Sequence, residues 1–401
     1  MDLKSGYPWW AVKNGLLQAF PPLEQDLRCD VLVVGGGITG ALTADAFARH
    51  GHEVAVVERR DIAWGSSAAS TGLLQYEIDA HMVDLAREYG EDAAVLAYRA
   101  CAEAIPALQT LARELRDVGF GTARSLYFAS RRRDGPGLQA EYALRAKHGF
   151  EVTWLPSQEL EARYGIQAPA AILSRLGGHL DPYRTAYRLL GRLRRRGSGV
   201  YDRTAIVHVQ TTSRGIVATT SGGVRIRAAH LVFAAGYANQ KWLKQDVARN
   251  RSSYAFVTDP VDRGLLGELR RTMVWESARP YLYMRPTGDG RLLVGGEDDA
   301  VDIPARRDAR VGKKARVLYK RVSKMFPHLP LRPAFSWAGT FAETKDGLPY
   351  FGAHPQHGPR VLFAMAYGGN GITYSMAGAR LLRALVERRR HPLARLFAFD
   401  R

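Results

Sequence analysis

Short apolar runs near the start of the chain predict a strand, a helix and a second strand. Residues 30–34 (DVLVV) and 53–57 (EVAVV) are almost continuously apolar, which is typical of parallel strands buried on both faces. Between them, small residues such as Ala41 and Ala44 recur at helical spacing, and Gly51 ends the helix. Together these segments form a β-α-β unit, in which the helix connects two parallel strands.

The rest of the chain alternates between helical and extended patterns. Alternating runs at 205–211, 215–220 and 224–227 predict a β-meander, and a hairpin turn is expected at Gly288-Asp289-Gly290. Helices are expected at 81–118, with a break near Pro106, and at 137–147, 183–196, 308–325 and 372–388. Further extended segments are expected at 124–130, 150–155, 230–235, 253–300 and 361–367.

Runs of the buried-strand type occur at the beginning, in the middle and at the end of the chain. The simplest arrangement is one discontinuous α/β domain into which a second, α+β domain is inserted twice. The first domain is expected at residues 27–82, 151–240 and 338–401. The second domain is expected at residues 83–150 and 241–337, after an irregular leader at 1–26.

The charge of the chain narrows the choice of partners only in part. The 57 Lys and Arg exceed the 39 Asp and Glu, which gives a net charge of +18 and favours anionic partners such as nucleic acid or a membrane surface. Only ten of the basic residues are lysines, and a GC-rich genome also produces such an excess of arginine. We therefore interpret the excess as a solvated arginine-rich surface, and peripheral contact with a membrane stays open.

Composition and cysteine usage exclude several classes of protein. The chain has 46% hydrophobic residues and no Gly-X-Y period, so it is neither disordered nor collagen-like. Its two cysteines, Cys29 and Cys101, show no metal-ligand spacing, so no metal site is predicted. No apolar signal region and no stretch of about 18 apolar residues is found, so we predict a cytoplasmic protein without a transmembrane segment.

A glycine motif lies at the turn between the first strand and the helix. Gly35 permits a tight turn, Gly37 lets the backbone approach a pyrophosphate, and Gly40 lets the helix pack closely on the strand. The helix then begins at Ile38 and Thr39, where free N–H groups and the positive end of the helix dipole favour phosphates. The motif therefore predicts a nucleotide site at this turn.

An acidic residue ends the second strand. Glu58 follows Gly40 by 18 residues, close to the spacing at which an acid binds ribose hydroxyls, and Arg59 stands next to it. A carboxylate at this place disfavours a 2′-phosphate, so NADP is not expected. The turn and the acid together predict an ADP-containing dinucleotide.

Three further stretches, the last of them in two parts, are rich in glycine and small residues. Residues 64–74 (WGSSAASTGLL) allow close backbone approach and donate hydrogen bonds. Residues 231–237 (LVFAAGY) end a buried strand in Ala-Gly, past which a ligand can run. Residues 337–352 (WAGTFAETKDGLPYFG) and 367–373 (YGGNGIT) precede a helix whose N-terminus favours negative charge on a ring edge.

These four stretches, in this order, resemble the D-amino-acid oxidase and glycine oxidase superfamily of FAD-dependent oxidoreductases over roughly residues 28–390. The pieces WAG and TKDG, with Asn370-Gly371-Ile372, are most similar to glycine oxidase. The resemblance implies an α/β fold in which a Rossmann-like FAD-binding domain carries an inserted α+β substrate domain. It also implies FAD as the cofactor, held without a covalent bond because the fourth stretch lacks the cysteine of covalent relatives.

The resemblance and the four stretches together assign the contacts to the cofactor. They are Gly35, Gly37, Ile38, Thr39, Gly40, Glu58, Arg59, Ser66, Ser67, Ser70, Thr71, Gly72, Leu73, Val207, Ala235, Gly236, Gly369, Asn370, Gly371, Ile372 and Thr373.

The substrate residues of the superfamily are only partly matched. Glycine oxidase binds its substrate carboxylate with two arginines, and Phe341 and Gly369 stand at the corresponding places here. Because a buried carboxylate needs a charged partner, either the substrate lacks a simple α-carboxylate or another residue, such as Arg285, binds it. Glu343 is a candidate partner of a substrate ammonium. No catalytic residue is assigned, and the pocket candidates are Tyr281, Tyr283, Arg285, Phe341, Glu343 and Tyr367.

The resemblance implies oxidation of a C–N bond in an amine or amino-acid-like substrate, with hydride transfer to flavin N5 and hydrolysis of the imine. The electron acceptor is O2 or another molecule, and strand 292–295 lacks the lysine with which some relatives activate oxygen. Three alternatives stay open: a 2-hydroxy acid dehydrogenase that reduces a quinone, a tRNA-modifying flavoprotein, and a flavin-binding subunit without activity. Nucleic acid is disfavoured because aromatic and basic residues are not interleaved.

Overall fold

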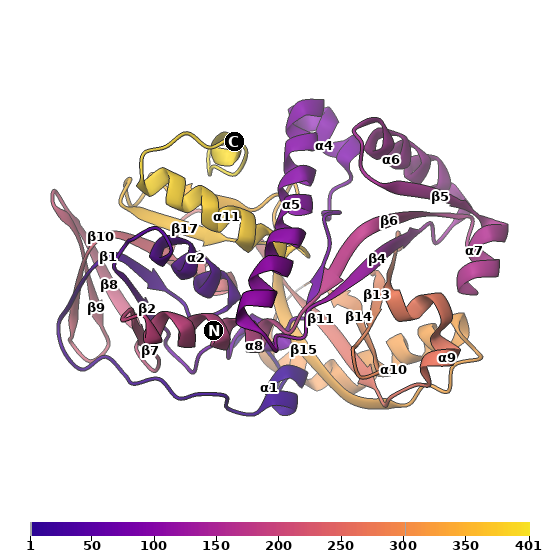
Figure 1. Cartoon of the computed structure of the whole chain (residues 1–401), viewed down its shortest axis with the longest axis horizontal. Helices are drawn as coiled ribbons and strands as arrows, with labels where there is room; N and C mark the ends of the chain where they lie inside the picture. The colour runs from indigo at the N-terminus through magenta and orange to yellow at the C-terminus, as the bar shows by residue number, and fades with distance from the viewer. Residues whose placement is uncertain (1, 301) are drawn as a thin grey trace.

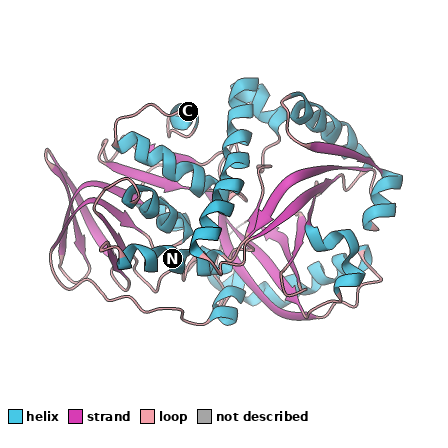
Figure 2. Ribbon diagram, in the orientation of Figure 1, coloured by secondary structure: helices cyan, strands magenta, loops and turns pink. Residues whose placement is uncertain are grey.

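Two β-sheets lie side by side, and the long helix α5 (Glu91–Leu115) stands between them (Figure 1). The structure is a computed structural model, and it describes residues 2–300 and 302–401. Helices pack on both sheets (Figure 2). The chain passes between the two sheets several times, so each sheet is built from segments that are far apart in sequence.

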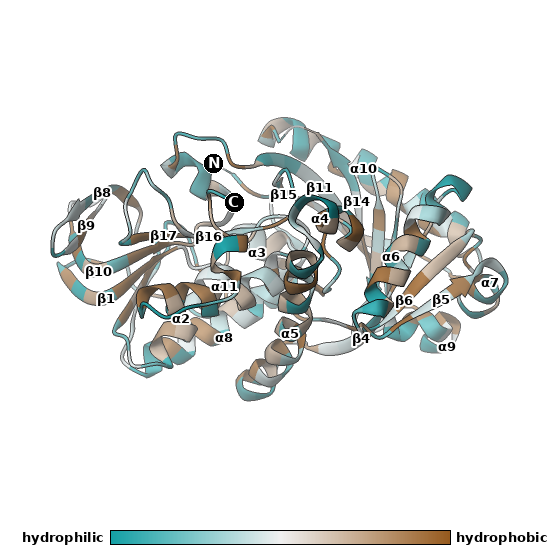
Figure 3. Cartoon of the chain, turned by 90° about the horizontal axis from the view of Figure 1, so that it is seen from above, coloured by the Kyte–Doolittle hydropathy of each residue, from teal (hydrophilic) through white to brown (hydrophobic). Residues whose placement is uncertain are grey.

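The first sheet is mainly parallel. Its strand order is β16 (Tyr350–Ala353), β17 (Val361–Met365), β10 (Arg225–Phe233), β1 (Leu27–Val34), β2 (Val54–Val57) and β7 (Gly199–Tyr201). Two more strands, β8 (Ile206–Thr212) and β9 (Gly215–Thr220), extend β10 as the expected antiparallel meander. Helices α2 (Ile38–Ala48), α8 (Pro182–Arg195) and α11 (Gly371–Val386) lie along one side of this sheet (Figure 3).

Burial explains why the apolar runs form these elements. Strand β1 lies between β10 and β2 and runs parallel to both, and Val31, Leu32 and Val33 have no exposed surface. Each fully buried side chain of this size contributes roughly 1.5–3 kcal/mol relative to exposure. On α2, Ala41 and Ala44 are equally buried, and their small side chains let the helix pack closely on its neighbours. The predicted β-α-β unit is therefore present.

The second sheet is mixed. Its strand order is β15 (Pro333–Glu343), β11 (Arg249–Thr258), β14 (Leu292–Asp299), β13 (Leu282–Pro286), β12 (Thr272–Glu276), β4 (Gly121–Phe128), β6 (Ala170–His179) and β3 (Leu73–Leu74), and β5 (Val152–Pro156) pairs with β6. Helix α10 (Pro304–Met325) packs on β11, β14 and β15. The remaining helices are α1 (Trp9–Asn14), α3 (Ser66–Ala69), α4 (Met82–Tyr89), η1 (Arg132–Asp134), α6 (Gly135–Lys147), α7 (Ser157–Tyr164), η2 (Gly236–Trp242), α9 (Arg263–Leu266), η3 (Gly267–Arg271) and α12 (Leu393–Leu396).

Two groups of elements lie elsewhere than the expected domain boundaries place them. Residues 152–179, which the sequence analysis places with the first domain, run in the second sheet, where β6 pairs with β4 and β5. Conversely, α5, which it places with the second domain, packs against α11 and α8 beside the first sheet. An apolar pattern indicates that a strand or helix is buried but not which sheet buries it.

The helix break expected near Pro106 is absent. Pro106 lies inside α5, and the break falls instead at Gly90, which separates α4 from α5 with a φ of 88°. A proline removes one N–H from the helical ladder, and packing against neighbouring helices holds α5 together across that gap. The glycine adopts a backbone conformation that side chains disfavour, and it therefore sets the boundary.

The leader is also more ordered than expected. It contains the helix α1, and Leu3 and Trp10 are only 3% and 4% exposed. Lys4 forms a β-bridge with Gly339 of β15. The first residues of the chain are therefore part of the core, and their irregular sequence pattern reflects contacts with distant segments rather than disorder.

Candidate active site

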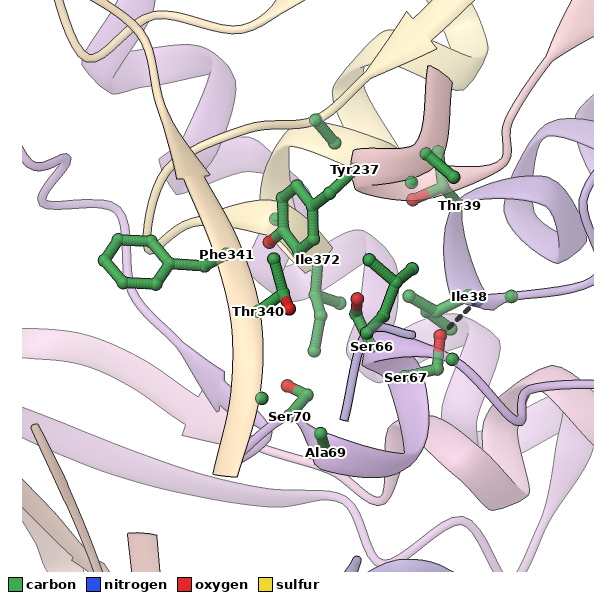
Figure 4. A pocket seen from close by; sticks show the side chains of 18 of the residues that line it. Ile38, Thr39, Ser66, Ser67, Ala69, Ser70, Tyr237, Thr340, Phe341 and Ile372 are labelled. Atoms are coloured by element: carbon green, nitrogen blue, oxygen red, sulfur yellow. Dashed lines mark hydrogen bonds between the residues drawn. The ribbon is translucent and has the colours of Figure 1, made fainter. Parts of the chain in front are cut away.

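A long cavity lies between the two sheets. Its lining comes from the β1–α2 turn, the loop around α3, the end of β10, strands of the second sheet and the start of α11. Figure 4 shows Ser66 and Ser70 along one side and Thr340 and Phe341 on β15, with Tyr237 nearby. All four sequence stretches with unusual numbers of small residues therefore meet around one space.

Glycine is required at Gly35 and Gly40 of the β1–α2 turn, and a side chain at Gly37 would be tightly packed. Gly35 has a φ of 122°, and a Cβ atom there would lie 2.4 Å from the carbonyl oxygen of Ala234. A Cβ atom at Gly40 would lie 1.8 Å from the carbonyl oxygen of Gly35, and one at Gly37 would lie 3.0 Å from Ser67 Oγ. The close backbone approach that the motif predicts is therefore present.

The N-terminus of α2 faces the cavity. Ile38 and Thr39 line it, and the helical ladder begins only with the N–H of Ala41, which donates to the Gly37 carbonyl at 2.9 Å. Ser67 Oγ accepts from the Ile38 N–H at 2.9 Å, the bond drawn in Figure 4. The backbone N–H groups of this first turn, with the helix dipole behind them, form an anion site.

Glu58 is held in place by the backbone. Its Oε2 accepts from the Gly36 N–H at 2.9 Å, and its Oε1 accepts from the Arg60 N–H at 3.0 Å. A carboxylate has further lone pairs, so it can still accept hydrogen bonds from a ligand in the cavity that it lines. Glu58 is therefore a fixed acceptor next to the anion site.

The loop around α3 contributes hydroxyl groups. Ser66 Oγ is buried and has no hydrogen-bond partner among the described residues, although it lines the cavity. Ser70 Oγ accepts from the Gly72 N–H at 3.1 Å, and the Thr71 hydroxyl lies 3.4 Å from that of Tyr283. A buried hydroxyl without a protein partner indicates that a bound group completes its hydrogen bonds.

The start of α11 lies against the same loop region. Asn370 precedes the helix, and its Nδ2 donates to the carbonyl oxygens of Gln75 at 3.0 Å and Glu77 at 2.9 Å. Gly371 and Ile372 open the helix and line the cavity. A second helix N-terminus thus points its positive dipole end at the cavity, where it stabilises negative charge on a ligand.

Aromatic side chains form the other end of the cavity. Tyr281 and Tyr283, on the approach to β13 and within it, have ring centroids 5.7 Å apart. Trp275 of β12, Tyr237 of η2 and Phe341 of β15 line the same cavity. Burial raises the pKa of Tyr283 to about 12, so its hydroxyl stays protonated at neutral pH and can donate a hydrogen bond.

Comparison with known proteins identifies the family. The model of the FAD dependent oxidoreductase (DAO) family matches residues 30–385, which is most of the chain. The chain belongs to this family. It is an FAD-dependent oxidoreductase, and the predicted resemblance, the fold class and the cofactor are confirmed.

Individual relatives of this flavoenzyme cover almost its whole length. It is 29% identical over 378 residues to glycine oxidase of Geobacillus kaustophilus (strain HTA426), covering 90% of this chain and 94% of that protein. It is 26% identical over 395 residues to gamma-glutamylputrescine oxidoreductase of Escherichia coli (strain K12), covering 94% and 88%. The structure of L-amino acid deaminase from Proteus vulgaris shares the fold, with a TM-score of 0.78, 16% identity and coverage of 96% and 100%.

The cavity of the flavoenzyme fits FAD. The anion site at α2 suits the pyrophosphate, Glu58 suits the ribose hydroxyls, and the unpartnered Ser66 hydroxyl and the start of α11 suit the flavin. The described lining contains neither cysteine nor histidine, which agrees with non-covalent binding. Burial raises the pKa of Cys101 to about 12, so this thiol is an unreactive part of the core.

Most predicted cofactor residues reach the cavity. Those that line it are Gly35, Gly37, Ile38, Thr39, Glu58, Arg59, Ser66, Ser67, Ser70, Thr71, Leu73, Ala235, Gly236, Gly369, Asn370, Gly371 and Ile372. Gly40, Gly72 and Thr373 support this lining from behind. A Cβ atom at Gly72 would lie 2.2 Å from the Leu180 carbonyl oxygen, and Thr373 Oγ1 donates to the Asn370 carbonyl at 2.9 Å.

Val207 lies outside the cavity, contrary to the prediction. It is 58% exposed on β8, whereas the preceding residues Thr204, Ala205 and Ile206 line the cavity. Successive side chains of a strand point to opposite faces, so an assignment that is one residue late turns a lining residue into an exposed one.

Arg285 does not face the aromatic end of the cavity. It follows Tyr281 and Tyr283 at alternate positions, but its side chain is 1% exposed beside the loop at 70–72. Its Nε donates to the Thr71 carbonyl at 2.7 Å and its Nη1 to the Pro286 carbonyl at 3.0 Å. Desolvation lowers the pKa of Arg285 to about 10, which still leaves it charged at neutral pH. Its Nη2 is buried without a hydrogen-bond partner among the described residues, but Arg285 is not part of the cavity lining, so it is not placed to bind a substrate carboxylate there.

Glu343 and Tyr367, two other pocket candidates, do not line the cavity either. Glu343 is an ion-pair partner of Arg251 on the neighbouring strand β11. Tyr367 is 1% exposed, and its hydroxyl donates to the Gly236 carbonyl at 3.2 Å. Its ring lies 5.3 Å from that of Tyr237, which is the aromatic residue that reaches the cavity instead.

The main residue that the sequence analysis missed is Asp79. It lines the cavity and is open to it, and its Oδ2 accepts from the Gly369 N–H at 2.7 Å. Desolvation raises the pKa of Asp79 above its ordinary value, the hydrogen bond from the Gly369 N–H and the charge of Arg279 lower it, and the Glu343 carboxylate raises it. A Cβ atom at Gly369 would lie 2.9 Å from Asp79 Oδ1, so the carboxylate occupies the space of a side chain there.

The basic residues of the cavity lining lie at the nucleotide end, away from Asp79. Arg59, Arg60 and Lys241 are the basic residues among the described lining, and Arg59 and Arg60 directly follow Glu58. Desolvation lowers the pKa of Lys241, and the nearby positive charge of Arg59 lowers it further. The described lining of the aromatic end therefore contains Asp79 and no cation, although Arg279 lies next to that end, with its guanidinium carbon 4.9 Å from the Tyr281 ring centroid.

Residues 2–300 and 302–401 contain no group of three or more His, Cys, Asp or Glu side chains that could hold a metal ion. No helix in this part of the chain is long and apolar enough to cross a membrane.

Proposed function

We propose that this flavoenzyme oxidises a C–N bond of an amine or amino-acid-like substrate. The observation that carries the proposal is the position of Asp79 in the aromatic end of the cavity, where the described lining has no basic side chain. A carboxylate beside Tyr237 and Tyr281 attracts an ammonium group through its charge and through the faces of the rings. Its similarity to glycine oxidase and to gamma-glutamylputrescine oxidoreductase supports an amine or amino-acid substrate.

Bound FAD supplies the acceptor for a hydride from the carbon that carries the nitrogen. The chain contributes the positions of the reactants. Asp79 pairs with the substrate ammonium, and the aromatic side chains exclude water and hold the carbon skeleton. The ammonium would release one proton to solvent water, and the iminium ion left after loss of the hydride would be hydrolysed by water to a carbonyl compound and an ammonium ion.

The position of the Asp79 carboxylate also disfavours the alternative that the enzyme is a 2-hydroxy acid dehydrogenase. A 2-hydroxy acid brings a carboxylate into the cavity, and that carboxylate would meet Asp79 rather than a cation. Arg285, the expected anchor, is held by two backbone carbonyls outside the cavity. The described lining of the aromatic end therefore offers a hydroxy acid no cation, and the cation next to it, Arg279, packs on the Tyr281 ring at 4.9 Å and interacts with Asp79.

Anaerobic reduction of the flavin tests the proposal. Amines, N-substituted amino acids and hydroxy acids are added to the holoenzyme, and the loss of the flavin absorption band is followed. We expect amines or amino acids to bleach the flavin, and bleaching by hydroxy acids alone would refute the proposal. Readmission of air then separates the acceptors, because reoxidation indicates O2 and its absence indicates a dedicated acceptor.

An Asp79→Asn variant tests the role of the carboxylate. Asparagine keeps an oxygen that can accept from the Gly369 N–H but removes the charge. Loss of a charge-assisted contact should raise KM for the amine about tenfold or more, with a smaller change in kcat. A KM equal to that of the unmodified enzyme would show that another group binds the amine.

A further inference from the structure

Three successive carbonyl groups of the cofactor loop are bound by three side chains from elsewhere in the molecule. The Ala69 carbonyl accepts from Trp337 Nε1 at 2.8 Å, the Ser70 carbonyl from Trp10 Nε1 at 2.6 Å, and the Thr71 carbonyl from Arg285 Nε at 2.7 Å. We call these three hydrogen bonds the loop clamp. They hold residues 69–71, which all line the cavity.

The three donors of the loop clamp are buried away from solvent. Trp10, Trp337 and Arg285 are 4%, 1% and 1% exposed, and they come from α1, β15 and β13. Trp10 also lies under the Arg285 guanidinium, whose carbon is 5.7 Å from a ring centroid of the indole. Buried carbonyl groups need a partner, and residues 69–71 lie between α3 and β3, outside both elements or at their end. The loop clamp therefore supplies hydrogen bonds that neither element provides.

The direction of the carbonyl groups decides what the loop offers the cofactor. Because the three carbonyl oxygens are bound by the clamp, the loop is held in one orientation at the cavity wall. In this orientation Ser66 and Ser70 lie along the cavity, as Figure 4 shows. Ser66 Oγ has no hydrogen-bond partner among the described residues, so it can bind a ligand. A loop fixed before the ligand arrives binds it with a smaller loss of conformational entropy.

The first residues of the chain fix α1 in the place from which Trp10 acts. The Leu3 carbonyl accepts from the Thr340 N–H at 2.9 Å, and the Ser5 N–H donates to the Ala338 carbonyl at 3.0 Å. Arg307, which is 1% exposed, donates to the Lys4 carbonyl at 2.7 Å. The leader is thus attached to β15 next to Trp337, so two of the three clamp donors rest on the same strand.

We propose that Trp10 is a positioning residue for FAD, and that the loop clamp sets the affinity of the apoprotein for the cofactor by fixing the loop at 69–71. This role of the loop clamp depends only on the binding of FAD, and it does not depend on which substrate the enzyme oxidises. It also gives the leader a role in cofactor binding, although none of its polar side chains needs to touch the cofactor.

The test compares two neighbouring tryptophans. Trp10→Phe removes the indole N–H and keeps an aromatic ring. Trp9→Phe is the matched control, because the Trp9 indole N–H is buried without a partner among the described residues and its ring packs on Phe335. Apoprotein of each variant is titrated with FAD, and the Kd is read from the change in flavin fluorescence. Visible circular dichroism of the bound flavin reports on the loop geometry.

We expect Trp10→Phe to raise the Kd for FAD about tenfold and to alter the flavin dichroism, because the Ser70 carbonyl loses its buried donor. Trp9→Phe should leave both unchanged. Trp337→Phe should act like Trp10→Phe through the neighbouring carbonyl, and it also serves if the Trp10 variant does not fold.

Two results would overturn the proposal. In the first, Trp10→Phe lowers the melting temperature of the apoprotein but leaves the Kd and the dichroism unchanged, which would make Trp10 a part of the core only. In the second, Trp9→Phe raises the Kd as much as Trp10→Phe, which would assign the effect to the packing of α1 rather than to the hydrogen bond.

Discussion

The two ends of the cavity are built in different ways. The nucleotide end uses the backbone of one continuous segment, in which the β1–α2 turn, Glu58 and the helix dipole lie within about one β-α-β unit. The aromatic end uses side chains from η2, β12, β13 and β15 and a carboxylate from the segment before α4. The comparison teaches that binding of the pyrophosphate and ribose is encoded locally, whereas the rest of the cavity, including the clamped loop at 69–71 and the aromatic end, depends on how distant segments are brought together.

The largest effect is expected at the nucleotide end. A Gly40→Ala substitution places a Cβ atom 1.8 Å from the Gly35 carbonyl oxygen, which neither backbone can avoid. We expect a loss of about 3 kcal/mol in stability, by the usual size of overpacking, and a protein that does not retain FAD. The ratio of flavin to protein absorbance after purification measures the retention.

Gly137→Ala is the control for this substitution. Gly137 lies in α6, where a Cβ atom meets nothing within 4 Å, so the variant should be yellow and as stable as the unmodified protein. A Gly40→Ala variant with full flavin content would show that the turn tolerates a side chain and would remove the contrast between the two ends.

An intermediate effect is expected from pH at the aromatic end. The pKa of Asp79 is raised above its ordinary value of 3.8 by desolvation, so the carboxylate takes up a proton at a higher pH than a solvated one. Since only the ionised form attracts an ammonium, binding of an amine should weaken as the pH falls through this raised pKa. The dependence of kcat/KM on pH should therefore show an acidic limb above pH 3.8.

This acidic limb can be assigned by substitution. Asp79→Asn should flatten it, because asparagine does not titrate in this range. Glu343 and Arg279 also interact with Asp79 through their charges, so Glu343→Gln should shift the limb without removing it. A limb that persists unchanged in the Asp79 variant belongs to another group.

The smallest effect is expected on the exposed face of β8. Val207 is 58% exposed and lies outside the cavity, so Val207→Ser should change the Kd for FAD by less than about twofold. Ala205 and Ile206 line the cavity, so Ile206→Ser should weaken FAD binding measurably. The reverse order of effects would restore Val207 as the contact.

The nucleotide end could be predicted from the sequence because its signals are local. The spacing of Gly35, Gly37 and Gly40 with Glu58 fixes a turn, a helix start and a strand end at once. Local signals also explain why the prediction of Val207 as a lining residue is wrong. The run at 205–211 shows alternation, but it does not show which of the two alternating sets of side chains faces inward.

The aromatic end could be predicted only in part. Tyr281 and Tyr283 are expected from their strand and Phe341 from its place in the resemblance to glycine oxidase, and all three line the cavity. Asp79 carries no such signal, because its partner Gly369 is 290 residues away. Arg285 has the alternate spacing of the tyrosines, but the loop at 70–72 covers it, and that loop is remote in sequence.

The attachment of the leader to β15 has a consequence for the order in which the site is completed during synthesis. Ser5 leaves the ribosome before its partner Ala338, which follows 333 residues later. A nascent chain therefore possesses the glycine turn and the loop at 69–71 long before it possesses the strand that holds the leader. A flavin that enters during this interval meets an open site, and the arrival of β15 closes the wall behind it.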